Sequence, residues 1–332
     1  MGRCSMKPCT LAFLVALIAP FVAASSSAES GVEAWQPPRM SWGAPDLQGT
    51  WTNATITGLE RPFQLRSPVL TPQEASDVEN WTADFYAAID QLPEGPLKAG
   101  ADVGGYNTFW MDPGNRLARV GGEIRSSLIV DPSDGKIPYS PHGSAMLSKR
   151  LADFQNADNP ETRFLGERCI VGFGSTGGPP MLPVLYNNHY QIVQSPGFVV
   201  ILVEMNHDAR IIRIGGERLP EPIRPWLGDS IGHWESETLV VETTQFNPGQ
   251  SFRASLRHQI YMSPDAIVVE RFTRIGLREI LYEFSVEDPS VFTQVWRGEV
   301  PMLAADGQIY EYACHEGNYS LTGVLAGARE ED

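Results

Sequence analysis

Beyond its first 30 residues, the 332-residue chain lacks any long apolar run. This excludes further membrane-spanning helices, which need roughly 20 consecutive apolar residues. The chain also lacks an excess of basic side chains, because 25 Lys and Arg stand against 40 Asp and Glu, a net charge of −15. Since phosphate backbones and anionic membranes repel such a surface, we expect no nucleic-acid partner.

Motifs for common cofactors and metals are missing as well. The sequence contains no His-Glu-x-x-His, no Cys-x-x-Cys, no acidic calcium loop and no Gly-x-Ser-x-Gly elbow. The Gly-rich segments GGEIRSS (121–127) and GFGSTGG (172–178) lack the lysine and following helix of a phosphate loop. We therefore expect neither a metal nor an organic cofactor.

Cysteines are few. Of the four, Cys4 and Cys9 lie in the N-terminal segment, so only Cys169 and Cys314 remain for the folded part. In an oxidising compartment two such cysteines most simply form a disulfide. It would close a loop of about 145 residues, worth on the order of 4 to 5 kcal/mol in the chain-entropy model. The alternative is two buried free thiols.

The N-terminus has the pattern of an export signal. Arg3 and Lys7 precede an apolar stretch from Thr10 to Ala24, and small residues continue to Ala28. We expect a signal peptide at 1–28 and a mature protein that is periplasmic or secreted. An uncleaved anchor is the alternative, but Pro20 interrupts a stretch that is already short for a membrane span.

The rest of the chain divides by pattern at about residue 183. Segment 29–182 is rich in Gly and Pro and predicts a strand over 50–56, helices over 72–90 and 144–155, a turn over 132–135 and long covering loops. The first helix has a capping box, because Thr71 precedes Pro72 and Glu74 follows three residues later.

Segment 183–332 predicts a β core made of short strands separated by turn signals. The expected strands are 190–194, 198–205, 209–216, 238–246, 266–275, 279–287, 293–302 and 309–315. We expect an all-β protein, an antiparallel calycin-like barrel or a β-sandwich, with 29–332 as one structural unit. The Gly-x-Trp at Gly49–Trp51 resembles the start of lipocalin barrels.

Four longer segments are similar to a family of exported bacterial proteins that has no settled activity. They are NNHYQIVQ (187–194), VEMNHDARII (203–212), WLGDSIGHWESETLVVETTQF (226–246) and YEYACHEGNY (310–319). The resemblance spans most of the mature chain. It implies secretion, a β-rich fold and no obvious cofactor motif, and it assigns no catalytic residue.

Carboxylates inside apolar strands are the most informative feature. Glu204, Glu242, Glu270 and Glu283 stand where a half-buried strand normally carries aliphatic residues. Desolvating an ionised carboxylate costs several kcal/mol unless it is paired, so they predict a polar interior. Arg–Glu ladders between neighbouring strands are the structural alternative.

Histidines in polar clusters supply the other half of a reaction centre, because imidazole exchanges protons near neutral pH. We expect one of His189, His207 or His315 to carry the proton, Glu204 or Glu242 to orient it, and Arg210 or Arg271 to stabilise negative charge. The expected substrate-binding residues are Tyr106, Trp110, Asn188, Tyr190, Trp234 and Tyr312. Loop hydrogen bonding for the histidines and core packing for the aromatics are the alternatives.

The function favoured by these patterns is cofactor-independent acid–base chemistry, meaning hydrolysis, elimination or isomerisation, on a small and partly apolar molecule. A periplasmic carrier that binds such a molecule without turnover is the competing class, and a purely structural role is a third. A histidine within hydrogen-bond reach of a buried carboxylate at a solvent-open site would favour the enzyme.

Overall fold

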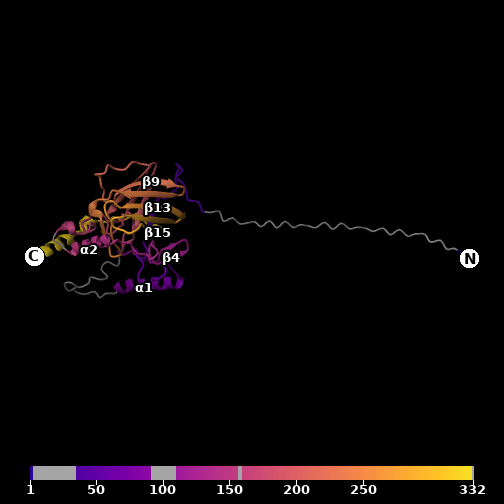
Figure 1. Cartoon of the computed structure of the whole chain (residues 1–332), viewed down its shortest axis with the longest axis horizontal. Coiled ribbons are helices and arrows are strands. Elements are labelled where there is room, and N and C mark those ends of the chain that lie inside the picture. The colour runs from indigo at the N-terminus through magenta and orange to yellow at the C-terminus, as the bar shows by residue number, and fades with distance from the viewer. Residues whose placement is uncertain (3–34, 91–109, 156–158, 331–332) are drawn as a thin grey trace. The chain divides into compact units, whose positions relative to one another are not determined.

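The computed structural model describes residues 1–2, 35–90, 110–155 and 159–330 (Figure 1). The expected signal peptide, apart from residues 1–2, and the candidate Tyr106 fall outside these ranges. Residues Trp35–Asp332 form one compact unit. No helix among the described residues has both the length and the apolar character to cross a membrane.

A closed barrel of nine strands forms the centre of this unit, which confirms the expected all-β barrel. Its order is β1-β6-β7-β8-β9-β10-β13-β14-β15, and β1 closes the ring by pairing with β15 at Trp51 and Ala304. The strands are β1 Gly49–Thr52, β6 His189–Ser195, β7 Phe198–Val203, β8 Ala209–Ile214, β9 Asp229–Glu235, β10 Thr238–Thr244, β13 Ile267–Gly276, β14 Glu279–Glu287 and β15 Trp296–Ala304.

The barrel is mixed, so the expectation of a purely antiparallel core was wrong at one place. Strands β8 and β9 pair in parallel, over only Arg213 with Ile231 and Ile214 with Gly232. The sequence prediction omitted β9, so it missed this crossover. The connection 215–228 runs back along the barrel before β9 begins, and a return of this kind makes neighbouring strands parallel.

The expected strand over 309–315 was also wrong. Residues 308–313 have no regular structure, and Cys314–Gly317 is a short helix, α3, followed by α4 at Tyr319–Glu330. Alternating aromatic residues at 310 and 312 resemble a strand locally. A further strand has no free edge to pair with on β15, however, because β14 occupies one edge and β1 and β5 (Ile129–Asp131) occupy the other.

Alternation along each strand places one set of side chains inside the barrel. The interior is filled with large side chains rather than left open as a lumen. The largest of these fully buried groups are Trp51, Tyr190, Phe272, Tyr282 and Trp296. A barrel of about this strand number has an interior just wide enough for side chains to fill.

Smaller elements surround the barrel. The capping box is confirmed, because Glu74 accepts from the Thr71 N–H at 2.8 Å and Thr71 Oγ1 accepts from the Glu74 N–H at 3.3 Å. Helix α1 begins there and lies beside a three-stranded sheet, as Figure 1 shows near β4. The remaining elements are α1 Pro72–Asp90, β2 Val69–Leu70, β3 Arg119–Val120, β4 Glu123–Arg125, α2 Pro141–Gln155, β11 Phe252–Ala254, β12 Gln259–Tyr261 and the 3₁₀ turns η2 Pro160–Thr162, η3 Met205–His207 and η4 Pro248–Gln250.

The Gly/Pro-rich loop 172–183 is buried against the barrel interior. Inward-facing side chains bind its backbone: the Tyr190 hydroxyl donates to the Thr176 carbonyl at 3.0 Å, and the Met181 N–H donates to the Tyr282 hydroxyl at 2.8 Å. The buried Arg253 side chain donates to the Pro179 carbonyl. This loop therefore packs as part of the core.

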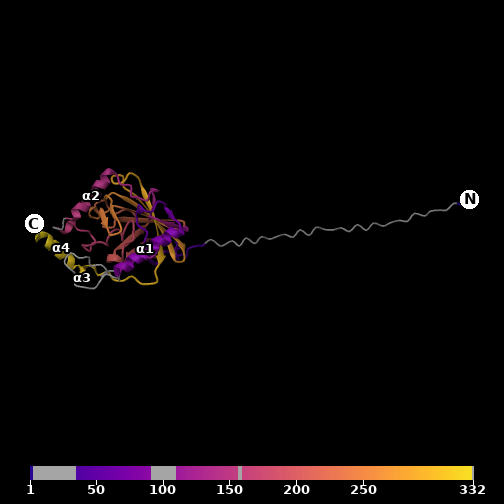
Figure 2. The same cartoon turned by 90° about the horizontal axis from the view of Figure 1, so that it is seen from below.

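Figure 2 shows α3 and α4 next to each other at one edge of the compact unit. A disulfide between Cys169 and Cys314, with 5.7 Å between the two Cα atoms, ties α3 to the loop that precedes the buried segment. The expected pairing of these cysteines is confirmed. We name residues 305–318 the C-terminal strap, because they run from the end of β15 to the disulfide and just beyond it.

Candidate functional site

Two of the four carboxylates, Glu204 and Glu270, are buried, whereas Glu242 and Glu283 face away from the barrel interior. Glu270 is fully buried inside the barrel, where Arg210 binds both of its oxygens and the Tyr282 hydroxyl donates to Oε1 at 2.8 Å. Burial lowers the pKa of Arg210 more than any other single influence, but the charge and hydrogen bonds of Glu270, with Tyr282 and Tyr190, together outweigh burial and raise that pKa. Arg210 and Glu270 thus satisfy each other as an interior ion pair.

Glu242 and Glu283 face away from the interior. Glu242 is 53% exposed and pairs with Arg218 on the surface. Glu283 is half-buried, and desolvation together with the nearby charge of Glu299 raises its pKa. No hydrogen bond or ion pair connects either of them to a histidine among the residues that the structure describes.

Glu204 is the carboxylate that meets a histidine. His189 Nδ1 lies 3.0 Å from Glu204 Oε2, and Glu204 is only 3% exposed whereas His189 is 28% exposed. Both residues lie on the outer wall of the barrel, where β6 begins and β7 has just ended. A buried carboxylate thus orients an imidazole that solvent can reach.

The local sequence explains why these two residues meet. Pro196 and Gly197 make the two-residue turn between β6 and β7, with Gly197 at φ +86°, where glycine is favoured. This turn fixes the register that pairs Tyr190 with Val203. The next pair along is His189 with Glu204, and the Glu204 N–H accordingly donates to the His189 carbonyl at 2.9 Å.

A second histidine lies in the turn that follows. Asn206 and His207 both have left-handed backbone angles, φ +63° and +53°, and the Val203 N–H donates to the Asp208 carbonyl across the turn at 2.8 Å. Asn and His tolerate this conformation better than most residues. The composition NHDA therefore forms the hairpin turn between β7 and β8, and it holds His207 in a defined position.

The C-terminal strap contacts both candidate groups. The Tyr310 N–H donates to Glu204 Oε1 at 3.2 Å, and the Tyr312 N–H donates to His207 Nε2 at 3.1 Å. The Tyr312 ring stacks 6.5 Å from the ring of Tyr186, which precedes β6. The strap therefore covers Glu204 and occupies the Nε2 lone pair of His207.

Electrostatics at the dyad favour the charged pair. The hydrogen bond to Glu204 raises the pKa of His189 more than burial lowers it, and the charges of Glu204 and Asp112 raise it further. Burial alone would raise the pKa of Glu204, but hydrogen bonds from His189 and the Tyr310 N–H outweigh it and lower that pKa. Glu204 therefore stays ionised near neutral pH while His189 titrates.

A groove of about 650 Å³ lies between the outer wall of the barrel and the strap. Neither His189 nor Glu204 lines it, but Gln191, on the same face of β6 as His189, and Tyr310, whose N–H binds Glu204, do. It is lined by Thr50, Gln191, Leu202, His207 and residues 306–311. Its lining mixes apolar and polar groups, as is usual for small-molecule sites.

Of the other candidates, two lie close to this site and the rest do not. Asn188 is buried and donates to the Asp112 carbonyl at 2.8 Å, so it fixes a neighbouring loop rather than facing solvent. Tyr312 lies in the strap. The remaining candidates stand elsewhere: Tyr190 in the barrel interior, His315 exposed on α3, Arg271 paired with Glu235 on the outer wall, Trp234 at a separate cavity, and Trp110 69% exposed.

Three groups at or near the site were not among the residues predicted from the sequence. The Tyr310 backbone amide binds Glu204, and Asp112 adds negative charge near His189. Backbone donors from an irregular segment carry no sequence signal, and Asp112 comes from a Gly/Pro-rich stretch whose path only the fold determines. Asp208, next to His207, was likewise not among the candidates.

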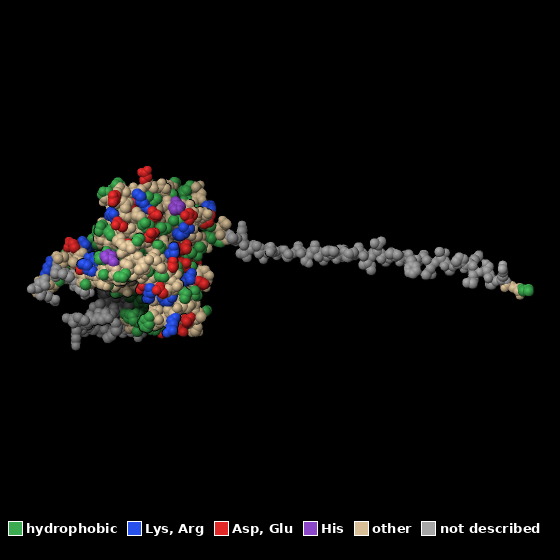
Figure 3. All heavy atoms as spheres, viewed as in Figure 1, with side chains coloured by type: hydrophobic (Ala, Val, Ile, Leu, Met, Phe, Trp, Pro, Cys, Tyr) green, Lys and Arg blue, Asp and Glu red, His purple; other side chains and the backbone are tan. Residues whose placement is uncertain are grey.

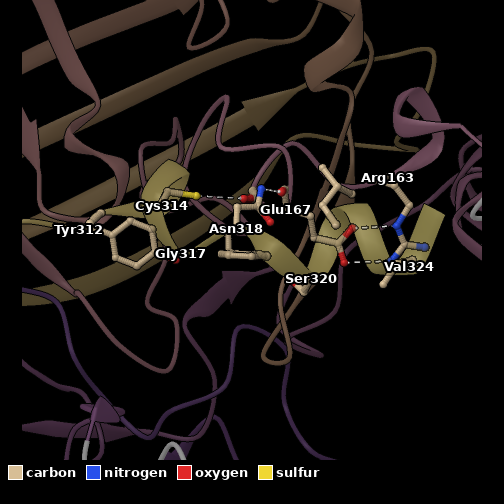
Figure 4. A pocket seen from close by; sticks show the side chains of 12 residues that line it. Arg163, Glu167, Tyr312, Cys314, Gly317, Asn318, Ser320 and Val324 are labelled. Atoms are coloured by element: carbon tan, nitrogen blue, oxygen red, sulfur yellow. Dashed lines mark hydrogen bonds and ion pairs between the residues drawn. The ribbon is translucent and has the colours of Figure 1, made fainter. Parts of the chain in front are cut away.

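A second cavity, of about 350 Å³, lies at the disulfide (Figure 4). Its charged groups are already satisfied, because Arg163 pairs with Glu167 at 3.0 Å and Asn318 donates to the Glu167 carbonyl at 2.6 Å. These contacts fasten α3 and the strap to the loop around Cys169. This cavity therefore anchors the strap.

Comparisons with protein-family models, with curated proteins and with solved structures found no match for this chain. In the parts of the chain that the structure describes, no three His, Cys, Asp or Glu side chains converge as they would around a metal ion. The chemistry of the site is therefore inferred from its geometry.

Proposed function

We propose that this protein is an exported enzyme that performs acid–base chemistry through the His189–Glu204 dyad. The reaction class is hydrolysis, elimination or isomerisation of a small, partly apolar molecule, with no organic cofactor. The observation that carries the proposal is the 3.0 Å contact between a buried carboxylate and a solvent-reachable imidazole, with an open groove on the same wall of the barrel that Gln191 and Tyr310 line. Export is supported by the pattern of residues 1–28 and by the disulfide.

The dyad assigns a role to each nitrogen of the imidazole. An ionised carboxylate only accepts hydrogen bonds, so Glu204 selects the His189 tautomer that carries its proton on Nδ1. The neutral ring then presents the lone pair of Nε2, for which the described residues offer no hydrogen-bond partner. Glu204 stabilises the imidazolium that forms when Nε2 takes a proton, as acidic partners do in other His-based sites.

The lining of the groove supports a small, partly apolar substrate. Leu202 and Ile309 supply apolar surface, while Gln191 and the backbone of the strap supply hydrogen-bonding groups. The barrel interior is filled by side chains, so a substrate has to bind on the outer wall. A carrier would also have to bind its ligand in this groove, but it would not need an oriented histidine.

The test is to incubate the purified protein with a metabolite extract of the source organism and to follow by mass spectrometry which metabolites are depleted. Wild type should convert at least one small molecule, and His189→Asn should reduce its rate by about 10²-fold or more. His233→Asn is the matched control, because His233 also pairs with a glutamate, at 3.1 Å, but is 59% exposed. Conversion by His189→Asn at the wild-type rate would refute the proposal.

A further inference from the structure

A third cavity, of about 390 Å³, lies where strands β8 and β9 diverge. Parallel pairing of these strands is limited to Arg213–Ile214 with Ile231–Gly232, so the first residues of β8 have no strand neighbour on that side. The connection 219–228 and the loop at 170–171 border the resulting gap. The cavity therefore results from the short parallel pairing, and its size suits a small molecule, since such sites span roughly 300–1,000 Å³.

Its walls are mainly apolar. The apolar side chains that line it are Ile170, Val171, Ile211, Leu219, Trp226 and Leu227. A Trp ring among aliphatic side chains can hold an apolar molecule and also attract a cation. The walls alone do not choose between a neutral and a charged ligand.

Asp208 gives the cavity a preference for a positively charged ligand. Asp208 is among the residues that line the cavity, and its Oδ2 accepts from the Gly172 N–H at 2.9 Å. Among the residues that the structure describes, no Lys or Arg forms an ion pair with it. Burial raises the pKa of Asp208 to about 6, because it outweighs the Gly172 and Asn206 hydrogen bonds and the electrostatic effect of His207, all of which lower that pKa. A largely desolvated carboxylate without a cation is costly, and a cationic ligand would relieve that cost.

The other charged groups at the cavity are already balanced. Arg210 is engaged by Glu270 inside the barrel, and its Nε is buried away from solvent. Arg213 pairs with Asp229 at 2.6 Å. Asp208 is therefore the charged side chain at this cavity that has no ion pair with a Lys or Arg among the described residues, which favours a cation over an anion.

We infer that this cavity binds a small apolar molecule that carries an ammonium group, with Asp208 as its counter-ion. The inference does not depend on the His189–Glu204 dyad. The net charge of −15 also favours the approach of cations. On the face shown in Figure 3, acidic and basic side chains are interspersed, so selectivity has to come from the cavity rather than from a surface patch.

The probe is 2-phenylethylammonium, measured by isothermal titration calorimetry with purified protein. The neutral 2-phenylethanol and the anionic 3-phenylpropionate serve as probes of similar size. We expect the cation to bind, and both others to bind at least roughly 30-fold more weakly. Near pH 6 binding should release about half a proton, because the cation ionises Asp208, and near pH 8 almost none.

Variants locate the site. Asp208→Asn keeps an oxygen for the Gly172 N–H and should weaken cation binding roughly 30-fold or more, whereas Asp265→Asn, at an exposed carboxylate, should not. Ile211→Trp should block the cavity from its exposed side without disturbing the core. His189→Asn should bind the probe like wild type, which separates this inference from the proposed reaction.

Three results would overturn the inference: no heat of binding at millimolar cation, equal affinity for the anion, or unchanged affinity in Asp208→Asn. A thermal melt of each variant checks that it is folded. Should Asp208→Asn fail to fold, Ile211→Trp decides, because unchanged affinity in that variant excludes the cavity.

Discussion

At the residue scale, the central feature is one imidazole whose protonation is set by one buried carboxylate. Activity that needs neutral His189 should rise with pH through the raised pKa of that residue, above its ordinary value of 6.5. In Glu204→Gln the charge that raises this pKa is gone, so the midpoint of the kcat/KM profile should move to lower pH. A profile with the same midpoint in both proteins would mean that His189 is not the titrating base.

The same pair makes stability depend on pH. The folded-state pKa of His189 is raised, so its contribution to folding stability is complete below pH 6.5 and is lost as the pH rises through the folded-state pKa. The folded-state pKa of Glu204 is lowered, so its contribution to folding stability is present above pH 4.5 and is lost as the pH falls through the folded-state pKa. The difference in unfolding free energy between wild type and Glu204→Gln should therefore be largest between 4.5 and 6.5. Urea titrations at acidic, intermediate and alkaline pH check this, and a difference that does not vary with pH would contradict it.

Glu270 and Glu242 lie on adjacent strands and show how burial decides the energy of an ion pair. Glu270→Gln leaves the Arg210 charge buried without its partner and should cost about 3–5 kcal/mol of unfolding free energy. Glu242→Gln removes a pair whose carboxylate is 53% exposed and should cost less than about 1 kcal/mol. Urea unfolding measures both, and equal losses would show that the interior pair is not desolvated.

At the element scale, the strap connects the end of the barrel to the candidate site. It has little secondary structure of its own before α3, and its amides bind Glu204 and His207. The Cys169–Cys314 disulfide and the Asn318 contact to the Glu167 carbonyl fasten its far end. The strap therefore depends on its anchor for its position over the dyad.

Replacing both cysteines by serine should loosen the strap and destabilise the whole chain. The disulfide joins residues 145 apart, so its loss should cost about 2–5 kcal/mol of unfolding free energy. Hydrogen exchange should speed up at the amides of Tyr310 and Tyr312 more than within β13 and β14. Equal protection of the strap in both proteins would show that its other contacts suffice, and Ser320→Ala, at the same cavity, is a control that keeps the disulfide.

At the scale of the whole molecule, the barrel is closed by its earliest strand. Strand β1 fills the gap between β6 and β15, more than 130 residues away in sequence, and Trp51 packs inside at 1% exposure. Closure removes free strand edges, which otherwise promote aggregation. The N-terminal part of the described chain therefore completes the core that later residues build.

Trp51→Ala should accordingly cost about 3–5 kcal/mol of unfolding free energy, because it leaves a cavity in a filled interior. Trp81→Ala on α1 is the matched control, since that ring is 66% exposed and stacks on Phe85. It should cost less than about 1.5 kcal/mol. Denaturant unfolding followed by circular dichroism distinguishes the two, and similar losses would indicate that β1 is not part of the cooperative unit.

What the sequence determined by itself is local or periodic. The capping box at Thr71–Glu74, the turn at Pro196–Gly197 and the alternation in β13 and β14 each depend on neighbouring residues, and the structure has all of them. The fold class followed from these periods, and the disulfide from having only two cysteines available.

Only the tertiary structure decided which carboxylate is buried and which group it pairs with. Glu242 and Glu270 sit in similar apolar runs, and alternation alone cannot tell which face turns inward when both faces carry apolar residues. The strap over Glu204, the parallel pairing of β8 with β9 and the cavity at Asp208 depend on chain closure over long sequence separations. Such contacts form only where distant segments share a surface, so no short sequence pattern specifies them.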